Sequence, residues 1–371
     1  YFVEVPDSDS SVNEHWRSAI AESQYLDLQP FFDQGVEALL LEDVKRRVAD
    51  LGTQVSERID RALRKESVPG NITRSNPFFV GRHDLLRDLH ERVGTGGRGT
   101  VTVVHGPGGL GKTELVVQYA HVYRDLYPGG VWQVDAEAQE ELLPTLARLA
   151  GTPELGLELT PEERGNPELA GRRVLAALRA RCGAEGRTLV LLDNVSRPSL
   201  LSARQVRELP DESWLRVVVT TREPADSFSS AHMLPLEIVP LTRDESVELI
   251  RDHRPATDKD RLIHDFASAE EKAAAEEIAG LLDGFTLAVE QVAVHLGRNA
   301  DRLTVSEFAA ALKKAGVTAT DKLVLSDSGV ADQIQHRDRL LSTILVETVA
   351  TLEPAARTAL EYAALLPPDE I

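Results

Sequence analysis

The sequence predicts an α/β fold in which helices cover both faces of a parallel sheet, with a helical domain after it. Three observations carry this prediction. Between residues 100 and 239, short apolar runs alternate with helical stretches, as expected of parallel strands that are buried on both faces. A glycine-rich string joins the first of these strands to the helix after it. Beyond Val239, apolar residues recur only at helical spacing.

Each element is predicted from its local pattern. The expected strands cover residues 100–105, 131–135, 189–193, 215–221 and 232–239. The expected helices between them cover residues 114–123, 142–149 and 170–181, and a loop rich in Pro, Glu and Gly covers 152–167. After the sheet, Thr242 and Glu245 have the spacing of a capping box, which predicts a helix through His253. Further helices are expected near 269–282, 285–297 and 304–315.

The two ends of the chain show weaker patterns. A short strand is expected at Phe2–Val5. Apolar residues recur every three or four positions over residues 36–63, which predicts one long amphipathic helix or two. Turn formers dominate residues 67–78 and mark a boundary. Towards the other end, a loop-rich junction is expected at 316–338, with helices near 339–350 and 354–366 after it.

Composition narrows the classes of function. The chain of 371 residues carries a formal net charge of −19, which argues against a surface that binds nucleic acid or an anionic membrane. Cys182 is the only cysteine, so neither an intrachain disulfide nor a cysteine-based metal site is expected. No apolar run approaches the ~18 residues that cross a bilayer, and no signal peptide opens the chain. We therefore expect a cytoplasmic setting, no membrane, and no nucleic-acid partner for this segment.

Residues 106–113, GPGGLGKT, fit the phosphate-binding pattern G-x-x-x-x-G-K-[ST] at every fixed position. Glycines let main-chain N–H groups curl around phosphate oxygens without Cβ clashes, and the next helix points its positive end at the same oxygens. Lys112 is expected to bridge the β- and γ-phosphates, and the Thr113 hydroxyl to bind Mg2+. The sequence thus predicts a P-loop that binds ATP or ADP with Mg2+. Its expected nucleotide contacts are Gly106, Gly108, Gly109, Leu110, Gly111, Lys112, Thr113 and Glu114.

Two further strands end in residues that would complete this site, and these residues are the candidate catalytic groups. Residues 189–193 form a buried-strand pattern ending in Asp193, the carboxylate expected to join Thr113 as a metal ligand. Asn194 comes next, which can orient water but is a poor base, so any ATP hydrolysis is expected to be slow. Arg222 directly succeeds the strand at 215–221 and is placed to sense the γ-phosphate at the carboxyl edge of the sheet.

In their order, these motifs resemble the NB-ARC branch of the STAND ATPases, the family of apoptosome scaffolds, plant disease-resistance proteins and many bacterial switch proteins. The resemblance runs from about Asn76 to the end of the chain. The family's P-loop is resembled by residues 106–113, and its metal strand by residues 189–194. Its first sensor is resembled by residues 220–222, and a strand common in bacterial members by residues 131–135. Its adenine-binding motifs are resembled by residues 79–82 and 284–288, which implicates Phe79, Val80, Arg82, Thr286 and Leu287. Thr286 stands where the family's G-L-P-L-A has a proline that packs on adenine.

The resemblance also implies a domain plan, in which a nucleotide domain, a helical domain and a winged helix close around ADP and open with ATP and a trigger. Residues 352–369 resemble the start of the winged helix. Residues 24–28 resemble the end of a TIR-type effector domain, with another effector's tail or a helical adaptor as the alternatives. We expect an N-terminal region at residues 1–70 and a P-loop domain at 71–241. A helical domain is expected at 242–320 and a truncated winged helix at 321–371.

The expected function is a nucleotide-gated signalling switch that self-associates on activation, in bacterial defence or regulation. Reversing a bias of about 99:1 between two states takes about 5.5 kcal/mol of differential binding. One charge-assisted contact, such as that from Arg222 to a γ-phosphate, contributes about 1.5–3 kcal/mol. Nucleotide alone should not reverse the switch, so we expect a trigger that is sensed beyond Ile371.

Two alternatives from other classes stay open. An ATP-hydrolysing remodeller or replication initiator of the AAA+ type would need a second acid beside Asp193, where the chain has Asn194. A passive scaffold with structural ADP would exchange no ATP and keep one assembly state. Two other classes are disfavoured, because the chain lacks the [NT]-K-x-D element of GTPases and the H-R-D and D-F-G pair of kinases.

Overall fold

The computed structural model describes residues 68–95, 100–183, 186–210, 213–228, 232–254, 256–258, 261–263, 265–315 and 357–358. The chain divides into two compact units, Tyr1–Val68 and Pro69–Ile371, and all described residues except Val68 belong to the second. The strand expected at residues 2–5, the helical stretch at 36–63 and the effector resemblance at 24–28 lie outside the described residues. So does the winged-helix segment, apart from a helical pair at 357–358.

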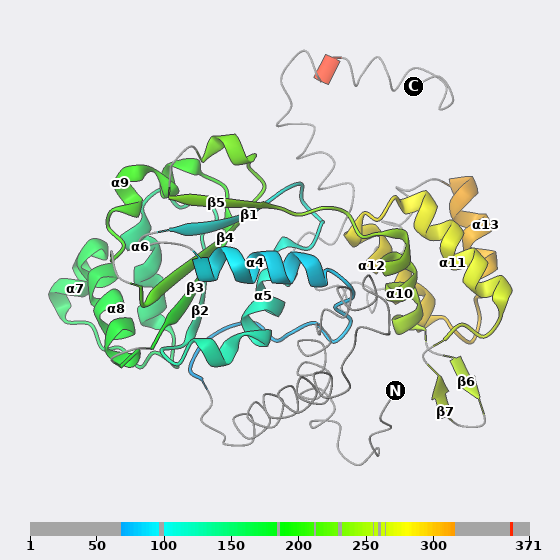
Figure 1. The fold of residues 1–371 in the computed structure, drawn as a ribbon, viewed down its shortest axis with the longest axis horizontal. Coiled ribbons are helices and arrows are strands. Elements are labelled where there is room, and N and C mark those ends of the chain that lie inside the picture. The colour runs from blue at the N-terminus through cyan, green and yellow to red at the C-terminus, as the bar shows by residue number, and fades with distance from the viewer. Residues whose placement is uncertain are drawn as a thin grey trace, which may run out of the picture. The chain divides into compact units, whose positions relative to one another are not determined.

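A five-stranded parallel sheet forms the centre of the α/β part, with the strand order β2-β3-β4-β1-β5 (Figure 1). All four neighbouring pairs of strands run parallel. The carboxyl ends of the strands therefore meet at one edge, and β1 lies between β4 and β5. This arrangement confirms the predicted parallel sheet. The strands are β1 Val101–His105, β2 Val131–Asp135, β3 Thr188–Val195, β4 Leu215–Thr221 and β5 Met233–Glu237.

Helices cover both faces of this sheet, as predicted. On one face, α4 (His83–Thr95) and α5 (Lys112–Val122) contact β1 and β4. On the other, α6 (Leu142–Ala147) and α8 (Pro167–Arg181) share one apolar core with the strands, which includes Val103. Short elements complete this part, namely α7 Pro161–Gly165, α9 Ala203–Val206, and the 3-10 turns Arg124–Leu126, Arg148–Gly151, Pro198–Leu201 and Ala225–Ser227.

Two helical segments differ from the expectation. The loop expected at 152–167 contains α7, which opens with a capping box between Thr160 and Glu163, and α8 begins at Pro167 after the cap Asn166. Proline directly after a capping residue is a helix start, because its fixed φ suits the first turn; the composition alone had indicated a loop. The helix α4 was not expected, although Leu86, Leu89 and Val93 are buried at helical spacing.

The helical part contains α10 (Arg243–His253), α11 (Ala269–Leu282), α12 (Thr286–Arg298) and α13 (Val305–Ala315) around a second apolar core. The expected capping box opens α10, since the Thr242 Oγ1 accepts from the Glu245 N–H at 3.2 Å and the Thr242 N–H donates to Glu245 Oε2 at 2.8 Å. An antiparallel hairpin of β6 (Ala256–Asp258) and β7 (Arg261–Ile263) comes after α10 and was not expected.

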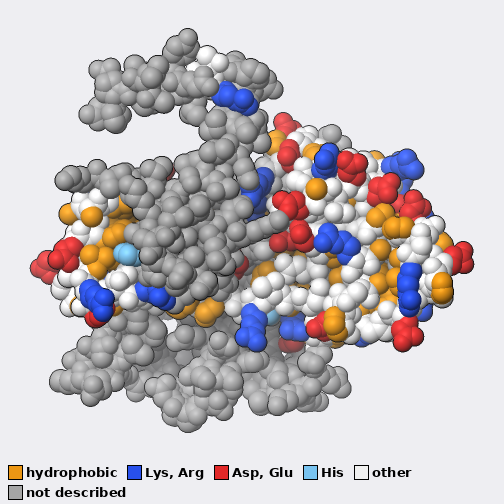
Figure 2. Space-filling model, turned by 180° about the vertical axis from the view of Figure 1, so that it is seen from behind, with side chains coloured by type: hydrophobic (Ala, Val, Ile, Leu, Met, Phe, Trp, Pro, Cys, Tyr) orange, Lys and Arg blue, Asp and Glu red, His pale blue; other side chains and the backbone are white. Residues whose placement is uncertain are grey.

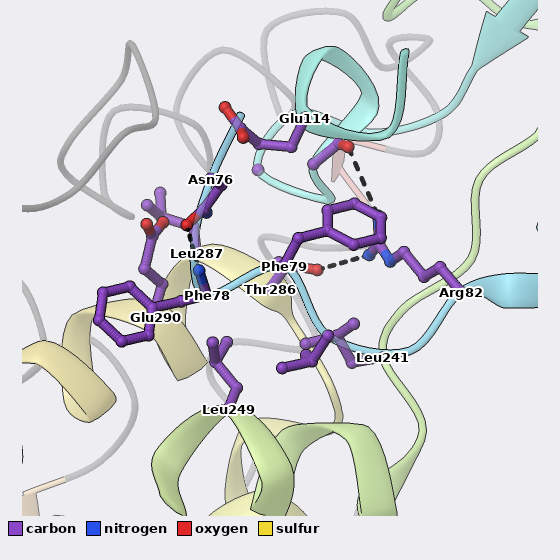
Figure 3. A pocket seen from close by; sticks show the side chains of 13 residues that line it. Asn76, Phe78, Phe79, Arg82, Glu114, Leu241, Leu249, Thr286, Leu287 and Glu290 are labelled. Carbon is purple, nitrogen blue, oxygen red and sulfur yellow. Dashed lines mark hydrogen bonds between the residues drawn. The ribbon is translucent and has the colours of Figure 1, made fainter. Parts of the chain in front are cut away.

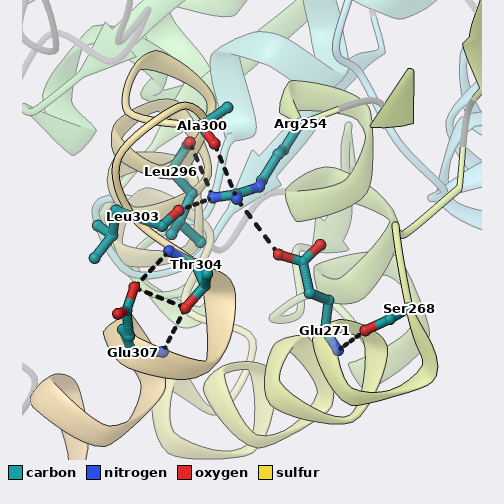
Figure 4. Close-up of polar contacts among 8 residues, drawn as sticks. All are labelled: Arg254, Ser268, Glu271, Leu296, Ala300, Leu303, Thr304 and Glu307. Carbon is teal, nitrogen blue, oxygen red and sulfur yellow. Dashed lines mark hydrogen bonds and ion pairs between the residues drawn. The ribbon is translucent and has the colours of Figure 1, made fainter. Parts of the chain in front are cut away.

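Arg254 joins the end of α10 to its neighbouring helices (Figure 4). Its guanidinium donates to the Leu303 carbonyl at 2.5 Å and to the Ala300 carbonyl at 3.3 Å. It also forms an ion pair with Glu271 of α11 at 3.4 Å, and the two side chains are only 10% and 16% exposed. One buried arginine thus links three helices of the domain that contacts the P-loop.

The surface of the described residues mixes both signs of charge. On the face shown in Figure 2, acidic and basic side chains are interspersed over the described part. None of the helices in the described segments is both long enough and apolar enough to cross a membrane.

Candidate nucleotide-binding site

The P-loop links β1, which ends at His105, to α5, which begins at Lys112. Its main chain turns through positive φ at Gly106 (142°), Gly109 (76°) and Gly111 (81°). Side chains are strained at such angles, so the loop needs glycine there. A Cβ on Gly106 would also lie 2.8 Å from the Ile238 side chain. The backbone path of this loop therefore depends on Gly106 and Gly111, which the motif fixes, and on Gly109, which it does not.

Lys112 extends back into the loop that precedes it. Its ammonium donates to the carbonyls of Gly106 at 2.8 Å and Pro107 at 2.7 Å, and the residue is only 8% exposed. Burial, together with the charge of Arg222, lowers the pKa of Lys112 to about 7, against the opposing charge of Asp193. A phosphate group beside this ammonium would restore its charge, because an anion favours the protonated form.

Asp193 accepts two hydroxyl hydrogen bonds at the end of β3. Thr113 Oγ1 donates to Asp193 Oδ1 at 2.7 Å, and Thr220 Oγ1 donates to the same oxygen at 2.5 Å. The Asn194 N–H donates to Thr220 Oγ1 at 2.8 Å, which joins β3 to β4. The structure thus brings Thr113 and Asp193 together, as the sequence predicted, although the two residues are 80 positions apart.

These oxygens fit a magnesium ion. Mg2+ prefers oxygen ligands and retains several waters, and in nucleotide sites it is bound through one or two protein oxygens plus the phosphates. Thr113 and Asp193 offer such a pair. Within the described part of the chain, no group of three or more His, Cys, Asp or Glu residues could hold a metal by itself. A metal bound here would neutralise phosphate charge and would depend on the nucleotide for its remaining ligands.

Arg222 comes directly after β4, beside the edge where Lys112 and Asp193 lie. Its charge contributes to the lowered pKa of Lys112, so the two cations lie within electrostatic reach of each other. Asn194 has a positive φ of 60°, an angle that asparagine tolerates better than most residues. The four groups expected to surround the terminal phosphates, Lys112, Thr113, Asp193 and Arg222, therefore lie at one edge of the sheet; their roles stay predictions.

A pocket lies next to the P-loop, and its empty space is about 530 Å³ with the open solvent at its mouth included (Figure 3). It lies between the segment before α4, the first turn of α5 and the first turn of α12. Eight of the predicted nucleotide contacts line it, namely Phe79, Val80, Arg82, Gly109, Gly111, Glu114, Thr286 and Leu287. Five further residues that line it were not predicted, namely Asn76, Phe78, Leu241, Leu249 and Glu290.

Some of these five residues could have been predicted as pocket residues from their spacing in the sequence. Glu290 lies four residues after Thr286, so both occupy the same side of α12. Asn76 and Phe78 precede the predicted motif, and the Phe78 N–H donates to Asn76 Oδ1 at 2.9 Å. The contact between Phe78 and His253 of α10, with ring centroids 3.9 Å apart, had no local signal.

Arg82 is buried in the wall of the pocket, with only 7% of its surface exposed. Its Nη2 donates to Thr286 Oγ1 at 2.9 Å and its Nη1 to the Gly111 carbonyl at 3.4 Å. Its main-chain N–H donates to Glu245 Oε1 at 2.7 Å. Burial lowers the pKa of Arg82 to about 10, against the opposing charge of Glu245. The guanidinium therefore stays charged at neutral pH and is held by the P-loop and by α12.

Glu114 lines the pocket from the first turn of α5. Burial, together with the charge of Asp193, raises the pKa of its carboxyl to about 7. The pocket therefore has an apolar wall, a buried cation and a carboxyl group beside the P-loop, features suited to a ligand that carries both a ring system and phosphates.

The fold and the site together define a P-loop nucleotide-binding protein, because a glycine-rich loop, a lysine, a threonine and a strand-end aspartate meet at the carboxyl edge of a parallel sheet. Residues 82–258 match the NB-ARC domain. This segment of the chain is therefore an NB-ARC domain.

Two curated relatives are regulatory proteins of Streptomyces. AfsR of Streptomyces griseus is 29% identical over 194 residues, which cover 49% of this chain and 18% of that protein. AfsR of Streptomyces coelicolor is 26% identical over 361 residues, which cover 92% of this chain and 31% of that protein. The chain spans less than a third of the length of these relatives.

Solved structures show more distant similarity. Cdc6p of Pyrobaculum aerophilum has a TM-score of 0.40 and 16% identity, covering 61% of this chain and 65% of its own. The STAND protein with a tetratricopeptide repeat sensor of Pyrococcus horikoshii has a TM-score of 0.36 and 15% identity, covering 60% and 31%.

Proposed function

We propose that this chain is the nucleotide-gated part of a bacterial regulatory switch, which binds ADP or ATP with Mg2+ and self-associates when activated. The observation that carries the proposal is the cluster at the carboxyl edge of the sheet, where Thr113 donates to Asp193 at 2.7 Å and Arg222 acts on Lys112. The name of the relatives, regulatory protein AfsR, favours regulation over defence.

The same cluster explains why a switch is favoured over a fast ATPase. A fast ATPase needs a base beside the metal carboxylate to activate water, and the residue after Asp193 is Asn194. Its N–H is bonded to Thr220, so this residue stabilises the sheet edge. A site that binds ATP and hydrolyses it slowly suits a protein whose bound nucleotide reports its state.

Recognition of the γ-phosphate falls to Arg222 in this proposal. One such contact contributes about 1.5–3 kcal/mol, and reversing a strong bias between two states takes about 5.5 kcal/mol. ATP therefore prepares the switch, and a separate trigger supplies the remaining free energy. We propose that the trigger acts through a region outside this segment.

The first experiment identifies the ligand. Purified protein is denatured, the released nucleotide is identified by chromatography, and Mg2+-dependent binding of ADP and ATP is measured by calorimetry. Wild type should contain or bind adenine nucleotide, Lys112→Ala should lose most of its affinity, and Lys272→Ala, a substitution on α11 in the helical domain, should match wild type. A nucleotide-free wild type that binds neither ADP nor ATP would refute the proposal.

The second experiment tests the switch. Assembly is compared by light scattering with ADP and with ATP, for wild type and Lys112→Ala. ATP-dependent self-association that requires Lys112 supports the proposal, whereas one unchanged assembly state in all conditions favours the passive scaffold. A steady-state turnover of about 10 per second, typical of enzymes, would favour the ATP-hydrolysing alternative.

A further inference from the structure

Three successive carbonyl groups of the P-loop are held by groups from outside the loop. The Gly109 carbonyl accepts from the Leu287 N–H at 3.0 Å. The Leu110 carbonyl accepts from Thr286 Oγ1 at 3.3 Å. The Gly111 carbonyl accepts from Arg82 Nη1 at 3.4 Å. Two of these donors belong to the first turn of α12, so the helical domain contacts the main chain of the P-loop directly.

The orientation of these carbonyls decides where the neighbouring N–H groups point. In a trans peptide the C=O and the following N–H point in opposite directions, and the described residues contain no cis peptide. The Gly111 carbonyl also accepts from the Leu115 N–H at 3.0 Å, as the first hydrogen bond of α5. Holding the carbonyls of Gly109 and Leu110 towards α12 turns the N–H groups of Leu110 and Gly111 to the opposite side. Those are the N–H groups that a P-loop offers to phosphate oxygens.

Thr286 links the donors to one another. Its hydroxyl accepts from Arg82 Nη2 at 2.9 Å and donates to the Leu110 carbonyl. Arg82 is buried and its own N–H is fixed by Glu245, so it has little freedom to find another partner. Without this hydroxyl, a buried guanidinium N–H and a loop carbonyl would both lose a partner, which is costly inside a protein.

We infer that Thr286 is a positioning residue for phosphate binding, which acts through Arg82 and the Leu110 carbonyl to preorient the P-loop N–H groups. The inference rests on the proposed nucleotide binding and adds the route by which α12 contributes to it. Because coupling between two equilibria is reciprocal, bound phosphates also stabilise the contact between α12 and the P-loop.

Three substitutions at residue 286 separate the hydroxyl from the rest of the side chain. Thr286→Val keeps the shape and removes the hydroxyl, and Thr286→Ser keeps the hydroxyl. Thr286→Pro also removes it and is compatible with the backbone, since residue 286 is the first of α12 and Phe285 has extended angles of φ −65° and ψ 102°. The matched control is Thr304→Val, which removes an exposed threonine hydroxyl that bonds Glu307 at the start of α13.

The test compares a ligand with phosphates and one without. Affinities for ADP·Mg2+ and for adenosine are measured by calorimetry, with displacement titration for the weaker ligand. We expect Thr286→Val to bind ADP about three- to tenfold more weakly, the effect of one or two hydrogen bonds, with adenosine affinity unchanged. Thr286→Pro can add a contact to adenine, so for this variant we expect the ratio of ADP affinity to adenosine affinity to fall by the same factor. Thr286→Ser and Thr304→Val should bind both ligands like wild type.

Other outcomes overturn the inference. Unchanged ADP affinity in Thr286→Val would show that the hydroxyl does not orient the loop. An equal loss for ADP and adenosine would make Thr286 a contact of the base or sugar instead. These results are distinct from failure of the proposed function, in which wild type itself binds no adenine nucleotide.

Discussion

Replacing Arg254 with methionine should destabilise the helical domain far more than neutralising its acidic partner. Methionine keeps much of the apolar stem but removes the donors to the carbonyls of Leu303 and Ala300 and the ion pair with Glu271. Glu271→Gln removes one charge and leaves an oxygen that can still accept from Arg254. The two variants together distinguish whether Arg254 acts mainly on helix-end carbonyls or mainly on the carboxylate.

The expected sizes come from the distances and the burial. Removing one partner of a buried ion pair costs about 3–5 kcal/mol, and here only the contact to Leu303, at 2.5 Å, is short. The contacts to Ala300 and Glu271 are longer, at 3.3 Å and 3.4 Å. We therefore expect Arg254→Met to lower the free energy of unfolding by about 3 kcal/mol, the low end of that range. For Glu271→Gln the loss should be about 1 kcal/mol or less, since the hydrogen bond survives.

Urea unfolding monitored by two probes separates the two parts of the described chain. Trp132 and Trp214 are buried in the sheet domain, residues 242–315 contain no tryptophan, and the third tryptophan, Trp16, is replaced by phenylalanine in every protein compared. Fluorescence therefore reports the sheet domain, whereas far-UV circular dichroism reports all helices. Arg254→Met should shift the dichroism transition to lower urea more than the fluorescence transition. Two results would contradict the expected role of Arg254: an equal decrease in the free energy of unfolding in both variants, or a decrease below about 1 kcal/mol in Arg254→Met.

Three single residues give further predictions. Burial lowers the pKa of His253 from 6.5 to about 4, so the unfolded chain binds more protons between these values; stability should fall as pH drops from 6.5 to 4, by up to about 3 kcal/mol. His253→Phe, which keeps a ring beside Phe78, should flatten that slope in denaturation curves. Asp193→Asn should reduce the gain in ATP affinity that Mg2+ provides by about tenfold or more, measured by calorimetry with Mg2+ and with EDTA; an unchanged gain would remove Asp193 from the metal site. Gly284→Ala should cost more than about 2 kcal/mol in thermal unfolding, because φ is +66° and a Cβ would collide with the Leu241 carbonyl; a stable variant would show that the α11–α12 turn can rearrange.

Local chemistry explains which elements could be read from the sequence. The strands at 131–135 and 215–221 match the observed β2 and β4, because buried parallel strands are continuous apolar runs with clear ends. The capping box at Thr242 and Glu245 places the start of α10, since both of its hydrogen bonds lie within one turn. The helix α7 was missed for the converse reason, because proline and glutamate occur both in loops and in first helical turns.

Among the site residues, too, local sequence patterns predicted some and gave no signal for others. The P-loop string specifies its own backbone, so Gly106, Lys112 and Thr113 could be assigned to phosphate binding from spacing alone. Asp193 could be proposed because the carboxyl ends of parallel strands meet at one edge. Leu249 of the adjoining pocket comes from α10, and nothing in its local sequence distinguishes it from an ordinary helix residue.

The sequence by itself determined the glycine-rich loop and the alternation of strands and helices, since each depends on neighbours a few positions away. It also predicted that Asp193 would meet Thr113, because the carboxyl ends of parallel strands share one edge. Only the tertiary structure decided the partners of Arg82, which are Gly111 in the P-loop and Thr286 at the start of α12. The physical reason is the separation along the chain. A P-loop is built by local backbone angles, whereas the hydrogen bond from Thr286 to the Leu110 carbonyl joins residues 176 positions apart and exists only once the helical domain has packed.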